Sequence, residues 1–209
     1  VVTLVQTSTQ DPNPALVGHY HYSITRTWTA TDACGHQSSA SQVITVQDVV
    51  APEIGAASAD ATLECPAVPE FTAPTATDNS GVVTVVEVSD VTTPGLCAGS
   101  YVRTKTWQAV DICTNRSALV SQTITVQDTT PPVLAGVPTN VVVAIDAIPV
   151  APTVTATDAC DAAPVVTLVQ TSTQDPNPAL AGHYHYAITR TWTATDACGH
   201  QSSASQVIT

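Results

Sequence analysis

Six cysteines are the side chains with the clearest chemistry in this sequence: Cys34, Cys65, Cys97, Cys113, Cys160 and Cys198. No C-x-x-C pair occurs, so a zinc ribbon is not expected. The chain carries 17 Asp and Glu against 5 Lys and Arg, a net charge of −12. An even number of cysteines in such an acidic, repetitive chain favours disulfides formed in an oxidising, extracytoplasmic setting.

Aspartates recur at the ends of the predicted strands: Asp48, Asp78, Asp111, Asp128, Asp158 and Asp196. Carboxylates from a linker and a neighbouring loop could converge on Ca²⁺, which takes six to eight oxygen ligands. The candidate ligands of such a junctional calcium are Asp48, Asp78, Asp128 and Asp158. The alternative is that these aspartates only cap turns.

The sequence Gly-His-Tyr-His-Tyr occurs twice, at 18–22 and 182–186. Strand alternation puts the two histidines on one face, where they could hold zinc only with a third ligand. The tyrosines on the other face either pack across strands or form an aromatic surface for a polysaccharide or a receptor. Those candidate contact residues are Tyr20, Tyr22, Tyr184 and Tyr186.

Several function classes are excluded. No nucleophile elbow, phosphate loop, H-E-x-x-H or clustered acid pair is present, so we predict that the chain is not an enzyme. Binding to nucleic acid needs a Lys/Arg footprint that this acidic chain lacks. No run of 18 apolar residues occurs, so no membrane span is expected within the sequence.

Internal repetition determines the predicted domain organisation. Val1–Thr45 recurs at Val165–Thr209, with 43 of 45 positions identical, and a weaker period of 80 lies inside that repeat. We therefore predict complete modules at 49–128 and 129–209, and the later part of a third at 1–48. The front strands for 1–48 come either from a longer parent chain or from a neighbouring chain by β-augmentation.

The elements that position these residues are short strands. Alternation in 24–30 places Ile, Trp and Ala on one face and threonines on the other. Turn signals such as Asp11-Pro12-Asn13-Pro14 separate the strands. This pattern predicts an all-β fold of tandem immunoglobulin-like sandwiches. Short Pro-bearing linkers favour an elongated array of these modules.

The modules also suggest which cysteines pair. The last module holds only Cys160 and Cys198, which should bridge. In the middle module Ser80 stands where Cys160 is expected, so Cys113 has no partner and Cys65 is left to pair with Cys97.

Two cysteines stay unpaired in this scheme. The partner of Cys34 would precede Val1. Cys113 is either a buried inert thiol or the site of an intermolecular cross-link.

The motifs T-A-T-D-N, T-P-G-x-C-A-G-x-Y, R-T-W-T-A-T-D-A-C-G and S-Q-x-I-T-V-Q-D resemble hyalin-repeat (HYR-like) immunoglobulin-like modules. More narrowly, they are similar to tandem repeats of surface adhesins and gliding-motility-associated proteins of Bacteroidota-type bacteria. The resemblance implies secretion, cell-surface display and adhesion, and it implies the same two cysteine pairs. Thr129, in Asp128-Thr129-Thr130, resembles the O-glycosylation signal of these bacteria.

These observations together predict a structural repeat segment of an extracellular fibre or adhesin stalk, without catalysis. Its partners would be neighbouring repeats of the same chain, with lateral self-association into filaments. The alternative is a carbohydrate- or receptor-binding module that uses the His/Tyr strand surface.

Overall fold

The computed structural model describes residues 1–209, and the chain is all-β, which confirms the predicted fold class. Its helical segments are two single 3₁₀ turns, η1 (Val17–His19) and η2 (Ala181–His183). Neither is long or apolar enough to cross a bilayer. Threonine and valine are disfavoured in helices but fit a pleated sheet, which explains why strands dominate.

Fourteen strands form five sheets, β1-β2-β3, β4-β6, β5-β9-β8-β7, β10-β11 and β12-β13-β14. The strand bounds are β1 Val2–Ser8, β2 Tyr22–Thr31, β3 Gln37–Val46, β4 Glu53–Ile54, β5 Ala61–Glu64, β6 Ala76–Thr77, β7 Val83–Pro94, β8 Tyr101–Asp111, β9 Val120–Gln127, β10 Val133–Ala135, β11 Thr155–Thr157, β12 Val165–Ser172, β13 Ile188–Thr195 and β14 Gln201–Ile208.

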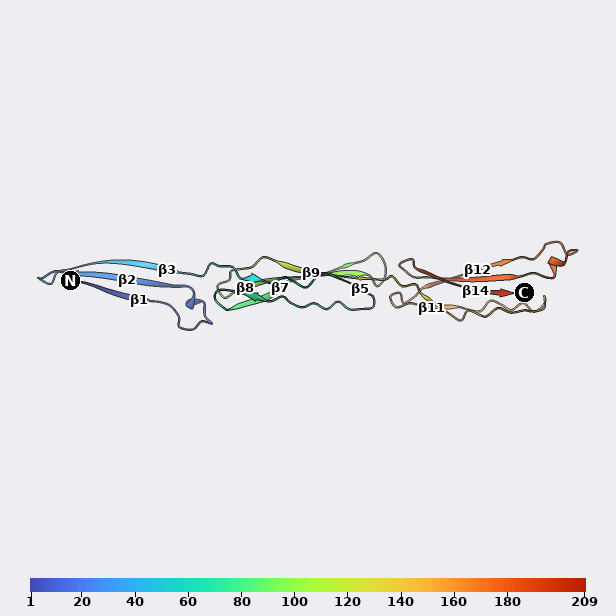
Figure 1. The fold of residues 1–209 in the computed structure, drawn as a ribbon, viewed down its shortest axis with the longest axis horizontal. Coiled ribbons are helices and arrows are strands. Elements are labelled where there is room, and N and C mark those ends of the chain that lie inside the picture. The colour runs from blue at the N-terminus through green and yellow to red at the C-terminus, as the bar shows by residue number, and fades with distance from the viewer. The chain divides into compact units, whose positions relative to one another are not determined.

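The two near-identical segments fold into the same antiparallel three-stranded sheet. Leu4 pairs with Trp28 in β1-β2, and Leu168 pairs with Trp192 in β12-β13. The central strand lies between its neighbours in both copies, and β1, β2 and β3 run side by side in the blue part of Figure 1. Because side chains alternate between the faces, this shared register puts the same residues on the same face in both copies.

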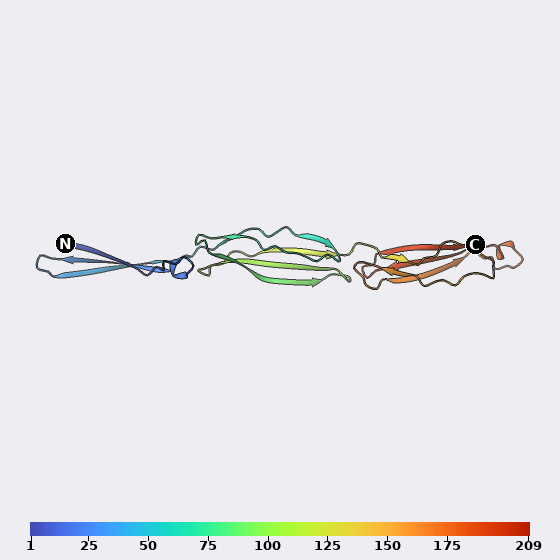
Figure 2. The same ribbon diagram turned by 90° about the horizontal axis from the view of Figure 1, so that it is seen from below.

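The middle of the chain has two sheets. Three strands of the larger sheet run antiparallel in the order β7-β8-β9, as the green and yellow strands of Figure 2 show, and β5 joins β9 in parallel. Alternate residues of β8 are buried, among them Trp107 and Ala109. Phe71 packs near Trp107, with ring centroids 6.3 Å apart.

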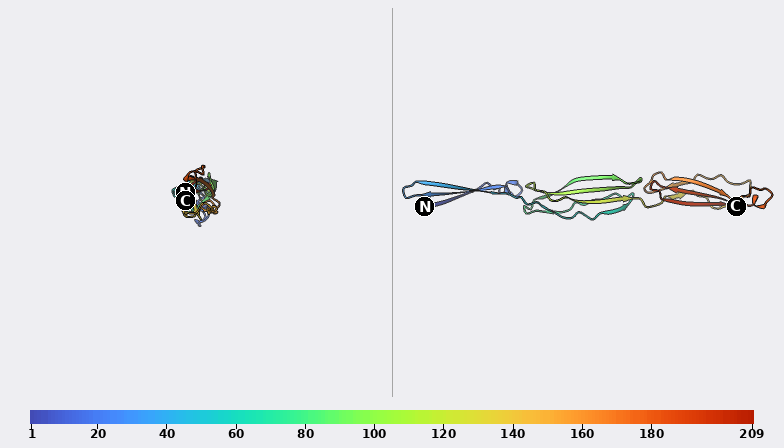
Figure 3. Two further views of the ribbon diagram at one scale, coloured as in Figure 1. Left: turned by 90° about the vertical axis from the view of Figure 1, so that its right-hand side faces the viewer. Right: turned by 90° about the horizontal axis from the view of Figure 1, so that it is seen from above.

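In the last part of the chain, β12-β13-β14 is covered by the segment 132–149. The hydroxyl of Ser202 donates a hydrogen bond to the Pro132 carbonyl, and Arg190 donates to the Pro149 carbonyl at 2.7 Å. This coverage buries Trp192, which is 2% exposed. The right-hand view of Figure 3 draws the strands of this sheet in orange and red.

The chain divides into two compact units. The first contains 1–60, 70–91 and 104–123, and the second contains 61–69, 92–103 and 124–209. Strands β7, β8 and β9 therefore contribute residues to both units. The module boundaries expected from the repeat, at 48/49 and 128/129, remain a prediction.

Candidate functional site

A five-residue turn follows the Trp-containing strand in all three repeats, at 32–36, 111–115 and 196–200. The first aspartate accepts the backbone N–H of the fifth residue at 2.8–2.9 Å. It also accepts a side-chain hydrogen bond from that residue, which is His36, Asn115 or His200. Each turn therefore fixes one carboxylate at the end of its strand.

The fourth residue of this turn has a positive φ, which favours glycine. Gly35 (φ 88°) and Gly199 (φ 91°) fill the position in the outer repeats, whereas Thr114 (φ 72°) fills it in the middle repeat. A β-branched residue in this region is strained. The middle turn is thus the strained copy, and it is the one beside the acidic group described next.

The Asp48 cluster consists of Asp48, Asp78 and Asp111. One carboxylate oxygen from each lies within 4.8 Å of the others. Asp48 and Asp111 are buried, with 8% and 5% of their surface exposed, and Asp78 is half-buried. The segment after β3, the loop after β6 and the end of β8 therefore meet at one point within the first unit.

Hydrogen bonds orient the carboxylates of the Asp48 cluster. Oδ1 of Asp48 accepts from the backbone N–H of Val50 at 3.0 Å and from Nδ2 of Asn79 at 3.2 Å. Oδ2 of Asp78 accepts from the backbone N–H of Ser80 at 2.8 Å. The second oxygens, Oδ2 of Asp48 and Oδ1 of Asp78, are buried and have no hydrogen-bond partner.

The His/Tyr segment contacts the residues around this cluster. Tyr20 donates its hydroxyl to the Ser80 carbonyl at 2.7 Å, and Nε2 of His21 lies 3.3 Å from the Asp48 carbonyl. Nδ2 of Asn115 donates to the same Asp48 carbonyl at 3.2 Å. These contacts join the N-terminal sheet to the segments that follow it.

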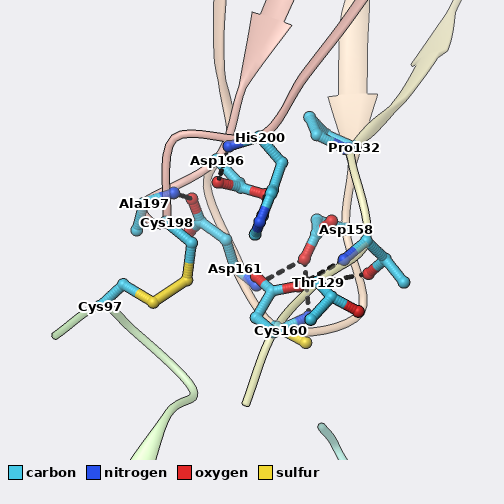
Figure 4. A network of polar contacts seen from close by, with 12 residues as sticks. Cys97, Thr129, Pro132, Asp158, Cys160, Asp161, Asp196, Ala197, Cys198 and His200 are labelled. Carbon is cyan, nitrogen blue, oxygen red and sulfur yellow. Dashed lines mark hydrogen bonds and ion pairs between the residues drawn. A yellow bond between two sulfur atoms is a disulfide. The ribbon is translucent and has the colours of Figure 1, made fainter. Parts of the chain in front are cut away.

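The equivalent aspartates of the second unit are arranged differently. Asp128 gathers with Asp196, Cys198 and His200, and we call these four residues the Asp128 cluster. Asp158 lies outside it. Its Oδ1 accepts the backbone N–H groups of Cys160 and Asp161, which form the turn drawn beside Asp196 in Figure 4.

Of the predicted calcium ligands, the structure thus brings Asp48 and Asp78 together in one cluster, and it places Asp128 in another cluster of which Asp158 is not a member. The sequence interpretation also left Asp111 out of the ligand set. The signal that could have included it is its place as the first residue of the recurring turn, at the end of the Trp-containing strand.

The predicted disulfide pairing is wrong. Cys65 bonds to Cys160 and Cys97 bonds to Cys198, with Cα–Cα distances of 5.7 and 5.0 Å. The expected bridges, Cys65 with Cys97 and Cys160 with Cys198, assumed partners within one module. In the second unit the loops that carry Cys65 and Cys97 lie beside the turns that carry Cys160 and Cys198, as the Cys97–Cys198 bond in Figure 4 shows.

The other two cysteines are free. Cys34 is exposed and Cys113 is buried. Burial raises the pKa of the Cys113 thiol, and the charges of Asp48, Asp111 and Asp78 raise it further. A thiol with a raised pKa is a poor nucleophile at neutral pH.

The aspartates of the outer turns have lowered pKa values. For Asp32, the hydrogen bond from the His36 side chain is the main cause. For Asp196, burial raises the pKa, but hydrogen bonds from the His200 backbone and side chain outweigh it, so the net shift is downward. Both carboxylates are therefore ionised at neutral pH.

The four candidate tyrosines have different surroundings. Tyr20 is engaged with Ser80, whereas its copy Tyr184 is 57% exposed. Tyr184 and Tyr186 line a groove of about 590 Å³ together with Val142, Ile145 and Ile208. Tyr22 is half-buried on β2.

Thr129 is exposed, and its hydroxyl donates to Oε2 of Glu64 at 3.0 Å. Its backbone N–H also donates to Oε1 of Glu64 at 2.6 Å. Glycosylation of Thr129 remains a prediction.

No family model and no curated protein matches this chain. Among solved structures it is similar to the protocadherin gamma-B4 extracellular domain (17% identity, TM-score 0.33), covering 91% of this chain and 39% of that one. It is also similar to protocadherin gamma-B2 extracellular cadherin domains 3–6, with 14% identity and a TM-score of 0.36, covering 99% of this chain and 65% of that one. A third similar structure is Drosophila N-cadherin EC1-4, with 10% identity and a TM-score of 0.34, covering 90% of this chain and 57% of that one. The chain thus spans well under the full length of these structures, and the fold assignment rests on its own sheets.

Proposed function

We propose that this chain is a structural repeat segment of an extracellular surface fibre or adhesin stalk of the HYR-like type, without a catalytic role. The observation that carries the proposal is the repeat itself. Two segments identical at 43 of 45 positions adopt one register, so the chain repeats a building unit rather than diversifying a site. Tandem units of this kind derive their properties from neighbour contacts.

Two features support the extracellular part of the proposal. The chain forms two disulfides, which persist in oxidising compartments. The composition is acidic, with one charge sign in clear excess. An excess of one charge sign keeps a repetitive chain soluble at a surface.

The partners of each repeat would be its neighbours. Within the first unit, Tyr20 and His21 contact Ser80 and Asp48, so the His/Tyr segment serves a connection along the chain. This use of the segment favours a stalk over a ligand-binding module. Lateral association of stalks into filaments is part of the same proposal.

Solution X-ray scattering of the purified 209-residue chain tests the stalk. A compact globule of this length would have a radius of gyration of about 17 Å. Three strand-length modules in line would give roughly 30 Å. A value near 17 Å would overturn the proposal.

One observation favours a second candidate, a carbohydrate- or receptor-binding module. The groove beside Tyr184 and Tyr186 is mostly apolar and presents an exposed aromatic ring, which suits stacking against a sugar. A glycan array probed with the wild-type chain and with Tyr184→Ala tests it. Binding that this substitution abolishes would support this candidate, and an array without binding would reject it.

A further inference from the structure

We infer that Asp48, Asp78 and Asp111 bind one calcium ion. The inference does not depend on the proposed function, because the scattering test can fail while calcium binding holds. It rests on three properties of the cluster: its geometry, its unpartnered buried oxygens and the absence of positive charge among its hydrogen-bond donors.

The geometry suits a hard cation of calcium's size. Calcium–oxygen distances are about 2.3–2.6 Å, so two ligands on opposite sides of the ion lie about 5 Å apart. The three ligand oxygens of the Asp48 cluster all lie within 4.8 Å of one another. One ion can therefore contact all three without a rearrangement of the backbone.

The buried oxygens point to a missing partner. Asp48 is 8% exposed, and its Oδ2 has no hydrogen bond, while its Oδ1 is held by Val50 and Asn79. Oδ1 of Asp78 is likewise buried without a partner, while its Oδ2 is held by Ser80. An unpaired buried carboxylate oxygen is costly, and a cation between the two would remove that cost.

The donors that hold the three carboxylates are neutral. They are the backbone amides of Val50, Ser80 and Asn115 and the side chains of Asn79, Ser80 and Asn115. Three like charges within 5 Å repel one another strongly in a partly buried site. A divalent cation offsets this repulsion where no Lys or Arg does.

The three carboxylate ligands favour calcium over the other common metals. All three ligands are carboxylates, which suit calcium or magnesium rather than zinc or copper. Magnesium demands a near-ideal octahedron at about 2.0–2.1 Å and keeps several waters, whereas calcium accepts irregular oxygen cages. The aspartates come from three separate segments, so their arrangement is irregular. An irregular arrangement suits calcium better than magnesium.

The Asp128 cluster provides a matched comparison. It also contains an unpartnered buried oxygen, Oδ2 of Asp128. However, its other members are Asp196, His200 and Cys198, and Cys198 is already in a disulfide. Asp128 also lies near Glu64, Cys65 and Cys160, and these two cysteines form the other disulfide. Each of these groups offers two carboxylates instead of three, so calcium should bind much more weakly there than at the Asp48 cluster.

Isothermal titration of the oxidised, metal-free 209-residue chain with CaCl₂ tests the inference, with MgCl₂ and ZnCl₂ titrated in parallel. We expect one site with a dissociation constant of about 10⁻⁴ to 10⁻³ M, the range of calcium sites in extracellular modules. Asp48→Asn and Asp111→Asn should each weaken binding at least about tenfold, because each removes one ligand charge. Asp128→Asn and Asp32→Asn should leave the constant within about twofold.

Circular dichroism of every variant checks that the sheets are intact, and the wild-type titration stands even if one variant fails to fold. The inference is overturned if the wild-type chain shows no saturable binding up to 10 mM calcium, on the order of ten times the weakest expected constant. It is also overturned if magnesium or zinc binds more tightly than calcium. Equal weakening by Asp128→Asn and Asp48→Asn would contradict the assignment to the Asp48 cluster.

Discussion

The sheets β1-β2-β3 and β12-β13-β14 have nearly the same sequence and the same register but different surroundings. Trp28 is 36% exposed on the first sheet, whereas Trp192 is 2% exposed on the second. The segment 132–149 covers the second sheet, and no stretch of 1–48 does the same for the first. The strand sequence therefore determines how the strands pair, whereas the segments packed against a sheet determine how far its side chains are buried.

The cysteine at the same position of the two copies offers the largest expected contrast. Cys198 bonds to Cys97 across 101 residues, while Cys34 is free. A loop of about 100 residues is worth about 4.7 kcal/mol in the chain-entropy model. The double substitution Cys97→Ala and Cys198→Ala should therefore destabilise the second unit by about 4 kcal/mol in urea unfolding.

Cys34→Ala is the control for that experiment and should change stability by less than about 0.5 kcal/mol, as an exposed surface substitution does. Peptide mapping of the wild-type chain under non-reducing conditions should recover Cys65 linked to Cys160 and Cys97 linked to Cys198. Recovery of a Cys65–Cys97 peptide would contradict the pairing.

The tryptophans give the next largest contrast. Trp192→Ala removes a fully buried ring and should cost about 3–5 kcal/mol. Trp28→Ala removes the same ring from a more exposed site and should cost less than half of that. Thermal unfolding followed by circular dichroism measures both, and equal costs would mean that the covering segment 132–149 contributes little.

A fall in pH should reduce stability more through the five-residue turn at 196–200 than through its copy at 32–36. The pKa of Asp196 in the folded chain lies below its ordinary value of 3.8. Its ionised form therefore stabilises the fold above pH 3.8, and that stabilisation is lost as the pH falls below 3.8 towards the folded pKa. Asp196→Asn should flatten this acid limb of the stability curve.

Asp32 has a pKa shifted in the same direction, but it is exposed and its turn is uncovered. Asp32→Asn should therefore flatten the curve less than Asp196→Asn does. Urea unfolding at intervals from pH 2.5 to pH 6, about the interval over which carboxylates titrate, compares the two. A larger effect of Asp32→Asn would show that the burial of Asp196 does not increase its contribution to stability.

The smallest expected effect extends the comparison to the middle repeat. Thr114 holds a φ of 72° where both outer copies have glycine. Thr114→Gly should stabilise the first unit by about 0.5–1 kcal/mol, since relief of strain exceeds the entropic cost of glycine. Gly35→Ala should have the opposite sign, and urea unfolding of the two variants measures both.

The sequence allowed the strands to be predicted because alternation and turn residues are local signals. The repeat likewise predicted that 24–30 and 188–194 would fold alike, and they do. The disulfides and the Asp48 cluster depend on which loops meet in space. Cys65 lies 95 residues from Cys160, and Asp111 lies 63 residues after Asp48. No periodicity encodes such encounters, and reasoning by elimination within a module excluded the observed cysteine partners.

The two disulfides have a mechanical consequence. Tension applied at Val1 and Thr209 is transmitted through two short covalent paths between Cys65 and Cys198. One path follows residues 66–97 and then crosses the Cys97–Cys198 disulfide. The other crosses the Cys65–Cys160 disulfide and then follows residues 161–197. Each path is shorter than the 62 residues between Cys97 and Cys160. Residues 98–159, which include β8, β9, β10 and β11, would stay slack while the cross-links carry the load.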